Sequence, residues 1–225
     1  MSLVRTGEAE CLMIPAVQGF ALGDWEATAR VMKAGGAGLD FAQSWFPQLE
    51  ADFKPGRVWL GIQGDDLVAY AVLEDDQPSN RATQLNDATW IMGDALELFF
   101  HAEGRPAYYE FHVTPDNVRL QLFFPSREAF LERRKHTHWA VADSRFESAA
   151  RVNDTRTQWE AVMRIKLALV LDEPRDDGSR RFRFSFSRYD YQPGRKRPVT
   201  SATTRLHAPD FHYIPEWDWA EAARG

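Results

Sequence analysis

The sequence predicts an all-β fold, a single antiparallel β-sandwich of two sheets with one or two short helices. Eight or more segments alternate apolar and polar residues, which is typical of strands with one buried and one solvated face. Turn-forming residues separate these segments, and many short strands divided by turns favour a sandwich or a barrel. No repeat or linker divides the 225 residues. We expect one domain over residues 1–225, with 1–14 as a loose N-terminal segment.

The first half of the chain is expected to hold one helix and five strands after a short opening strand at 15–22. Asp24 is a candidate N-cap for a helix at 25–34, and Gly35 and Gly36 would end it. An irregular segment follows at 39–55, and a polar loop is expected at 75–88. The expected strands are 57–63, 67–74, 95–101, 108–114 and 118–124.

The second half begins with a short helix at 127–136, for which Ser126 is the candidate cap. Strands are then expected at 146–152, 157–165 and 180–191, followed by an extended, proline-rich C-terminal part. Trp159 lies on the apolar face of the second of these strands. In the third strand Phe182, Phe184 and Phe186 alternate strictly with polar residues, so these aromatic rings are expected in the core.

Composition and charge exclude several classes of function. The 33 acidic and 27 basic residues give a net charge of -6, which argues against nucleic acid as the main partner. The single cysteine, Cys11, excludes an intrachain disulfide and a cysteine-based zinc site. No apolar run is long enough to span a membrane, and the first residues lack the apolar region of a signal peptide.

Signatures of catalysis are weak. The motifs of P-loop nucleotide binding, zinc proteases, α/β-hydrolases and dinucleotide binding are missing. Asp94 and Glu97 leave open a glycoside-processing enzyme, although residues three apart on a strand point to opposite faces. His136 and His138 form a pair without an obvious third metal ligand, so we favour a solvated helix end for them.

Tryptophan is frequent, with eight residues, and this favours a carbohydrate site. A pyranose ring stacks its axial C–H groups on a flat aromatic ring, while a few placed polar groups satisfy its hydroxyls. Trp90 lies between a polar loop and the turn at Gly93 and Asp94, where an exposed ring is expected. Trp59 and Trp159 are expected in the core instead.

An ordered set of motifs resembles the carbohydrate-binding module family 9-like proteins of the wider DOMON-like group. Glu74, Asp75 and Asp76 form an acidic run after a strand pair. The W-x-x-D-x-x-E-[LI]-F element of the family is matched from Trp90 to Phe99 with one extra residue before Asp94, and a Y-Y-E-F-x-V-x-P strand runs from Tyr108 to Pro115. The segments from Trp159 to Ile165 and from Phe211 to Glu216 match later parts of the family pattern. The resemblance covers most of residues 15–220.

The resemblance implies a non-catalytic module that binds a saccharide on a concave sheet face by tryptophan stacking and polar contacts. Trp90 and Glu97 match the stacking tryptophan and the glutamate, and an arginine of sugar-binding members falls near His112. The second tryptophan of the family would fall at 198–201, where this chain has no aromatic residue. The candidate ligand-binding residues are therefore Trp90, Asp94, Glu97, His112, Tyr189 and Trp217, with Tyr191 also able to approach.

The family also implies a structural calcium ion, for which Asp75, Asp76 and Asp87 are the candidate ligands, with a solvated acidic loop as the alternative. Family members are usually exported, which implies an extracellular or periplasmic location. A DOMON-like sensing or interaction domain for a non-sugar ligand is another reading, including a haem held by Met92 and His112. The glycan and the oligomeric state stay open.

Overall fold

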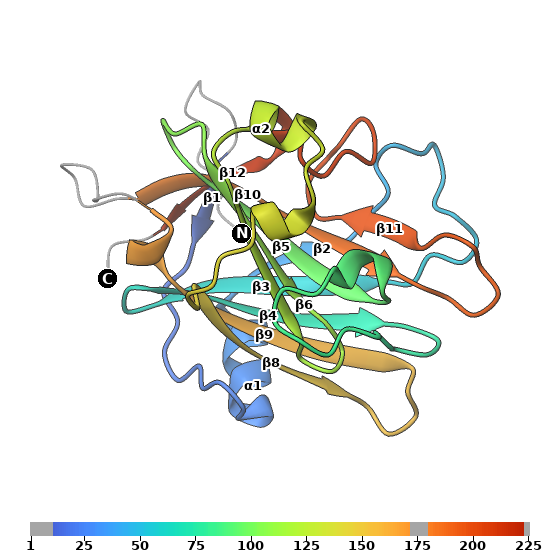
Figure 1. Cartoon of the computed structure of the whole chain (residues 1–225). Helices are drawn as coiled ribbons and strands as arrows, with labels where there is room; N and C mark the ends of the chain where they lie inside the picture. Colours follow the sequence, from blue (N-terminus) through green and yellow to red (C-terminus); the bar gives the residue numbers. More distant parts are fainter. Residues whose placement is uncertain (1–10, 172–179, 223–225) are drawn as a thin grey trace.

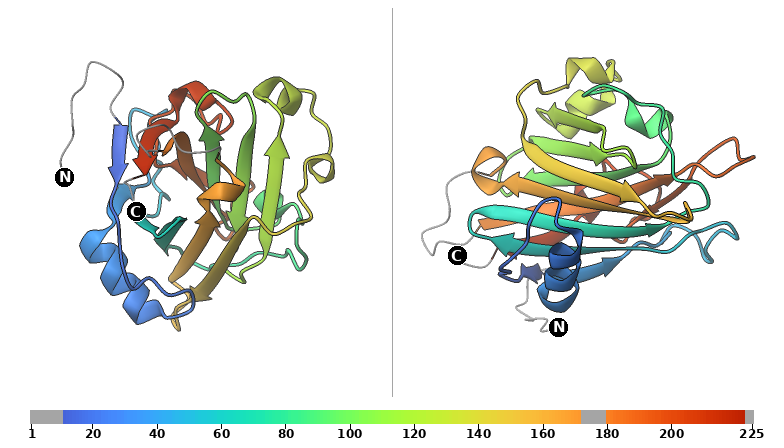
Figure 2. Two further views of the ribbon diagram at one scale, coloured as in Figure 1. Left: turned by 90° about the vertical axis from the view of Figure 1, so that its left-hand side faces the viewer. Right: turned by 90° about the horizontal axis from the view of Figure 1, so that it is seen from below.

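The computed structural model describes residues 11–171 and 180–222 and confirms the all-β sandwich of two sheets (Figure 1). The larger sheet runs from edge to edge through β1 (Cys11–Ile14), β12 (Asp218–Ala222), β10 (Arg180–Asp190), β5 (Ala95–Ala102), β6 (Tyr108–Val113) and β7 (Arg119–Phe124), and β11 (Val199–Ala202) also pairs with β10. The smaller sheet contains β2 (Ala37–Asp40), β3 (Gly56–Gln63), β4 (Asp66–Glu74), β9 (Gln158–Lys166) and β8 (Phe146–Val152). Figure 2 shows the two layers from the side and from below.

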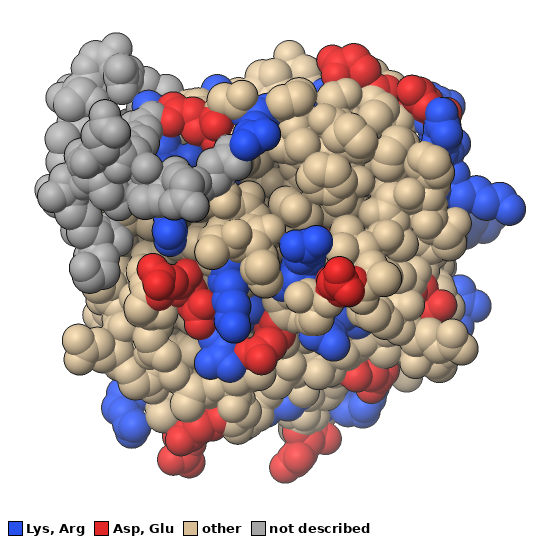
Figure 3. All heavy atoms as spheres, turned by 60° about the vertical axis from the view of Figure 1, so that its left-hand side comes forward, with Lys and Arg blue, Asp and Glu red and all other residues tan. Residues whose placement is uncertain are grey.

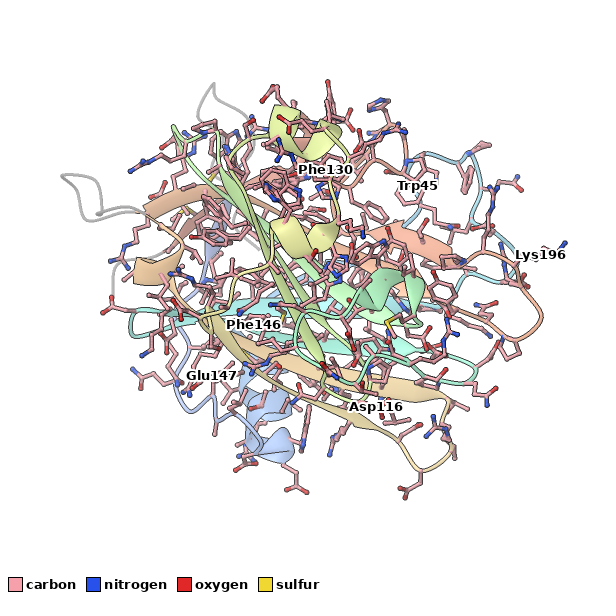
Figure 4. The ribbon with its side chains drawn as sticks, in the orientation of Figure 1. Trp45, Asp116, Phe130, Phe146, Glu147 and Lys196 are labelled. Carbon is pink, nitrogen blue, oxygen red and sulfur yellow. The ribbon has the colours of Figure 1, made fainter. Side chains whose placement is uncertain are left out.

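The main core lies between the two sheets and contains the faces that the alternation predicted. Trp159 on β9 is fully buried, and so are Phe182, Phe184 and Phe186 on β10. Burying each large apolar side chain contributes roughly 1.5–3 kcal/mol, so this layer dominates the stability of the fold. At the start of β8, Phe146 is buried and its neighbour Glu147 is exposed (Figure 4).

The predicted first helix is confirmed as α1 (Trp25–Gly35), which covers the outer face of the smaller sheet (Figure 1). Asp24 caps it, because its carboxylate accepts the backbone N–H of Ala27 at 3.0 Å. Gly36 ends it, since its N–H donates to the carbonyl of Met32. The Met32 side chain packs with Tyr70 of β4 in a small satellite core.

The outer face of the larger sheet is also covered, by α2 (Arg127–Leu131), η2 (His136–His138), η4 (Ile214–Glu216) and the loops around them. A second apolar cluster lies beneath this cover and includes Phe99, Tyr108, Phe124 and Trp217. Figure 1 shows α2 above the larger sheet, on the side away from α1. The face that the sequence suggested was solvated is therefore enclosed by irregular segments.

Three expectations about element bounds are wrong. The strand expected at 15–22 is reduced to a bridge between Ala16 and Ile62, because the Gln63 side chain bonds both backbone groups of Phe20. The second helix ends at Leu131 rather than 136, since Arg133 takes a left-handed φ of 52° that stops the helix.

The third concerns the N-terminal segment expected to be loose over 1–14. Residues 11–14 of that range form β1, which pairs in parallel with β12 at the edge of the larger sheet. Residues 1–10 lie outside the described part of the chain. The other strand pairings, including those of β5 with β6 and β10, are antiparallel.

Charge is dispersed over the surface. On the face drawn in Figure 3, Lys and Arg side chains alternate with Asp and Glu, in line with the net charge of -6. Within the described residues, no helix has the length and apolar character needed to cross a membrane.

Candidate functional site

A cavity of about 430 Å³ opens on the outer face of the larger sheet. Its volume falls in the range of small-molecule sites. Strands β5, β6 and β7 form its floor, and the segments at 130–139 and 209–212 form its walls. Aromatic side chains dominate the lining, among them Trp90, Phe130, Trp139, Tyr189 and Phe211.

Trp90 belongs to η1 (Thr89–Ile91), a single turn that leads into β5. Its backbone carbonyl accepts the hydroxyl of Tyr191 at 2.7 Å, which ties the turn to the end of β10. The indole is half-buried and meets the His136 ring edge-on, with the ring centroids 5.3 Å apart. Trp90 is therefore a positioned aromatic wall of the cavity, half-buried where the sequence predicted an exposed ring.

Trp139 is a second tryptophan in the same cavity, and the sequence did not indicate it. It follows η2, and its carbonyl accepts the N–H of Phe123 at 2.9 Å, which attaches the segment to β7. Its ring packs against Phe124 with the centroids 5.5 Å apart. The chain at 198–201, where the family pattern places its second tryptophan, forms most of β11 and does not line the cavity.

The cavity floor carries two glutamates and a histidine on neighbouring strands. Glu97 of β5 pairs in register with His112 of β6, and Glu110 lies two residues earlier on the same face. The His112 Nε2 atom lies 2.5 Å from Glu110 Oε1 and 3.3 Å from Glu97 Oε1. The three side chains are almost fully buried, with exposed fractions of 0 to 5%.

Burial and neighbouring charges shift the pKa values of these three side chains in different directions. Burial raises the pKa of Glu97 to about 8, and the His112 imidazole offsets only part of that rise. Burial alone would raise the pKa of Glu110 too, but the imidazoles of His212 and His112 hold it below its ordinary value. Burial opposes charge on His112, yet the two carboxylates raise its pKa. The floor therefore holds a compact set of coupled acid and base groups.

His212, on the wall segment 209–212, adds a second imidazole beside Glu110. Its Nδ1 atom lies 2.8 Å from the hydroxyl of Tyr108, and its Nε2 atom lies 3.7 Å from Glu110 Oε2. The ring stacks on Phe130 of α2, with centroids 3.6 Å apart, so the cover and the floor are in direct contact. Figure 4 shows Phe130 on α2, above the larger sheet.

The structure brings together four of the six predicted ligand-binding residues. Trp90, Glu97 and Tyr189 line the cavity, and His112 lies beneath it in contact with Glu97. Asp94 and Trp217 do not line it. Trp217 is 2% exposed and donates its indole N–H to the carbonyl of Phe211, so it supports the wall from behind.

Asp94 is fully buried in a structural role. Its carboxylate accepts the backbone N–H groups of Ser79 and Tyr191, each at 2.6 Å. It therefore faces away from the cavity that Glu97 lines, and the two do not form the acid/base pair that a glycosidase would need. The Gly93 before it has a φ of 152°, and a Cβ there would lie 2.3 Å from the carbonyl oxygen of Ser79.

The predicted calcium ligands are held by separate partners. Asp75 is buried 3.3 Å from Arg188, whereas Asp76 pairs at 2.7 Å with Lys54. Asp87 accepts two backbone N–H groups of the loop that precedes it. The three carboxylates do not converge, so the proposed combination of Asp75, Asp76 and Asp87 is not a metal site in the described structure.

Asp75 instead converges with Asp94 and Asp190, and their carboxylate oxygens lie within 4.8 Å of one another. The Arg188 guanidinium lies among them, 3.6 Å from Asp190. This buried acidic group therefore already contains its own cation.

The structure also places the histidines of the two other candidate sites, a haem held by His112 and a metal held by His136 and His138. The haem reading with Met92 stays a prediction, and His112 is fully buried, with Thr89 Oγ1 2.7 Å from one ring nitrogen and Glu110 beside the other. His138 is exposed, whereas His136 lines the cavity and bonds the carbonyl of Asn86. The pair does not belong to a three-ligand group among the described residues.

Stability is expected to fall as pH rises through the neutral range, in part because of Asp94. Burial and the nearby Asp75 carboxylate raise the pKa of Asp94 to about 7, and burial raises that of Asp190 to about 6. A folded-state pKa above the unfolded one means that the linked stabilisation is complete below about pH 4 and lost as pH rises through about 7. Between about pH 5 and about pH 8, Asp94 alone accounts for roughly 2–3 kcal/mol.

The Asp94→Asn variant checks this account by thermal unfolding across the same pH range. It loses the ionisable group, so its melting temperature should depend less steeply on pH than that of the wild type. An amide accepts fewer hydrogen bonds, so the variant should melt lower than the wild type at acidic pH and should lose that deficit as pH rises and Asp94 of the wild type ionises. Equal slopes for the two proteins would contradict the assignment of the pH dependence to Asp94.

The sandwich, with a cavity on the outer face of one sheet, has the fold of carbohydrate-binding module family 9. A protein from Bacteroides uniformis to which carbohydrate binding is ascribed superposes with a TM-score of 0.69 at 13% identity, over 95% of this chain and 99% of the other. A family 9 module from Caldicellulosiruptor kristjanssonii in complex with cellotriose superposes with a TM-score of 0.58 at 10% identity, over 95% and 94% of the two chains. Its glucose complex gives the same TM-score and identity, over 95% and 96%.

No protein-family model and no curated protein matches the chain in sequence. The likeness therefore confirms the expected fold at low sequence identity.

Proposed function

We propose that this chain is a non-catalytic saccharide-binding module whose ligand occupies the cavity lined by Trp90 and Trp139. The observation that carries the proposal is the pairing of two half-buried tryptophans with buried carboxylates in one cavity of about 430 Å³. The cellotriose and glucose complexes of the structurally similar module agree with a saccharide as the ligand.

The lining provides both kinds of contact that a sugar needs. The indoles of Trp90 and Trp139 offer flat apolar faces for the axial C–H groups of a pyranose. Glu97 and Glu110 offer acceptors for hydroxyl donors at the floor. A neutral oligosaccharide end would thus bury its apolar face against the walls and its hydroxyls against the floor.

A glycoside-processing enzyme fits the geometry less well. That reading requires a second carboxyl group across the scissile bond from Glu97. Asp94, the partner named for it, is buried and committed to two backbone N–H groups. Glu110 lies beside Glu97 on the same His112 nitrogen, so these two carboxyl groups do not face each other across a bond. We accordingly place the chain among binding modules, and we expect the exported setting that is usual for such modules.

A titration of the wild-type protein with a panel of neutral oligosaccharides, including glucose and cellotriose, tests the proposal. At least one sugar should shift the tryptophan emission in a saturable manner, because the ring environment of Trp90 and Trp139 changes on binding. The matched control is Trp25→Phe, which removes an indole from α1 on the opposite side of the sandwich. It should retain the response, and a panel without any saturable response at millimolar sugar would contradict the proposal.

A further inference from the structure

The floor of the cavity gathers three side chains with the donor atoms of a metal site. Glu97, Glu110 and His112 each offer one ligand atom, and these atoms lie within 4.8 Å of one another. The residues come from the paired strands β5 and β6, where Glu97 and His112 are register partners. A hydrogen-bonded ladder fixes their backbones, so the three donors are placed by rigid elements.

The carboxylates at the floor have few partners for buried groups: Glu110 contacts His112 through Oε1, and its Oε2 atom lies 3.7 Å from His212. Glu110 is 5% exposed, and within the described residues its Oε2 atom has no hydrogen-bond partner. Glu97 is 2% exposed, and its carboxylate lies 3.3 Å from His112 Nε2. Asp94, by contrast, accepts two backbone N–H groups. Buried charged groups are usually paired or coordinate a metal. Glu97 and Glu110 have carboxylate lone pairs that are available to coordinate an ion.

His112 is oriented as metal-bound histidines are. Its Nδ1 atom lies 2.7 Å from Thr89 Oγ1, and its Nε2 atom points at the two carboxylates. A histidine that binds a metal through one ring nitrogen almost always forms a hydrogen bond through the other, which fixes its tautomer and the direction of the ring. Ser187, the register partner of Glu97 on β10, adds a buried hydroxyl oxygen without a partner among the described residues.

We propose that Glu97, Glu110 and His112 bind a divalent first-row transition-metal ion such as Zn²⁺ at the floor of the cavity. One imidazole and two carboxylates suit zinc and its neighbours in the transition series. Three protein ligands leave a coordination position for water or a ligand, and here that position faces the cavity.

The acidic group of Asp75, Asp94 and Asp190 differs from the floor group in its ligand atoms and in its neighbouring charge. It offers oxygen donors without an imidazole, and Arg188 already supplies a positive charge between its members. The group on the cavity floor has access to solvent through the cavity and has no guanidinium among its contacts. The geometry therefore favours the floor over the second cluster as the site of a bound ion.

Zn²⁺ binding to chelator-treated, dialysed protein tests this proposal by isothermal titration calorimetry in the absence of sugar. The wild type should bind about one ion per chain. The variants Glu97→Gln and Glu110→Gln should bind at least about a hundredfold more weakly, because loss of a direct ligand costs more than the ten- to hundredfold loss seen for outer partners. Their circular dichroism should match that of the wild type.

The matched control is His207→Gln. The His207 imidazole is exposed and lies 2.7 Å from Glu216, so this pair offers the kind of surface site that collects zinc adventitiously. His207→Gln should bind Zn²⁺ as the wild type does. Loss of binding in this control, or equal binding by the wild type and a folded Glu97→Gln, would overturn the proposal.

A measurement on the wild type alone covers the case in which the variants do not fold. Co²⁺ should add a visible absorption band, and Zn²⁺ should displace it at about one equivalent per chain. Absence of both a Co²⁺ band and a calorimetric Zn²⁺ signal would likewise overturn the proposal. The test uses metal without sugar, and the oligosaccharide titration can be run in chelator, so the failure of one proposal is distinguishable from the failure of the other.

Discussion

Replacing Arg188 by methionine is expected to destabilise the fold by about 3–5 kcal/mol. Arg188 is 1% exposed, and its guanidinium lies 3.3 Å from Asp75 and 3.6 Å from Asp190. It also donates to the backbone carbonyls of Lys54 and Glu74, at the end of the strand pair where β3 begins and β4 ends. Its removal leaves buried carboxylates without a cation, and that loss is a large part of the 5–15 kcal/mol that holds a typical domain together.

Urea unfolding at neutral pH measures this effect. The control is Arg134→Met, which removes an exposed ion pair with Glu132 at 2.7 Å and should cost less than about 1 kcal/mol. Adding Asp75→Asn to Arg188→Met should restore part of the lost stability, because one of the uncompensated charges disappears. A loss below about 1 kcal/mol for Arg188→Met would show that Arg188 does not compensate these carboxylates.

Replacing Trp90 by alanine is expected to weaken saccharide binding by about 2 kcal/mol, or roughly thirtyfold. The indole supplies an apolar wall of the cavity, and alanine at this position leaves no ring on which a pyranose can stack. The turn itself should persist, because Tyr191 bonds the backbone carbonyl of residue 90 rather than its side chain. Titration calorimetry with the best sugar of the panel measures the change in Kd.

Trp25→Ala is the matched control, since Trp25 lies on α1 beside Arg151 and far from the larger sheet. It should bind the same sugar with unchanged affinity. The unfolding free energies of both variants should be measured, so that a loss of binding is not confused with a loss of folding. Equal affinity of Trp90→Ala and wild type would remove Trp90 from the site.

The regular part of the fold could be predicted because burial imposes a period of two on each strand. Trp159 and Phe184 stand at positions whose neighbours are polar or less buried, and both lie in the core between the sheets. Asp24 likewise marked the start of α1. The strand β1 was missed because four residues at a sheet edge carry too little pattern, and because its partner β12 is some two hundred residues away in sequence.

The site could be predicted only in part. Trp90 and Glu97 stand out because they flank a turn that enters a strand. Trp139 and His212 come from irregular segments whose positions depend on long-range contacts, such as the bond from Phe123 to the carbonyl of Trp139. Glu110 could have been found, because it occupies an alternate position on β6 beside buried apolar residues, where an acidic residue indicates a polar site.

The three predicted calcium ligands do not converge, for a physical reason. Asp75 and Asp76 are neighbours in sequence, but on an extended chain their side chains point apart, one toward Arg188 and the other toward Lys54. The alternation on β10 places Arg188 on the core face with Phe184 and Phe186, but it does not show that Asp75 and Asp190 lie there beside it. Convergence of carboxylates depends on strand pairing and not on proximity along the chain.

The most direct test of the central claim is a ¹H–¹⁵N spectrum of the tryptophan indole N–H groups during titration with a bound oligosaccharide. The eight tryptophans give one indole signal each, and variants such as Trp90→Phe and Trp139→Phe assign the two in the cavity. We predict that the signals of Trp90 and Trp139 shift in a saturable manner, while those of Trp25 and the buried Trp159 stay in place. A titration that shifts other indoles and leaves Trp90 and Trp139 unchanged would contradict a saccharide site in this cavity.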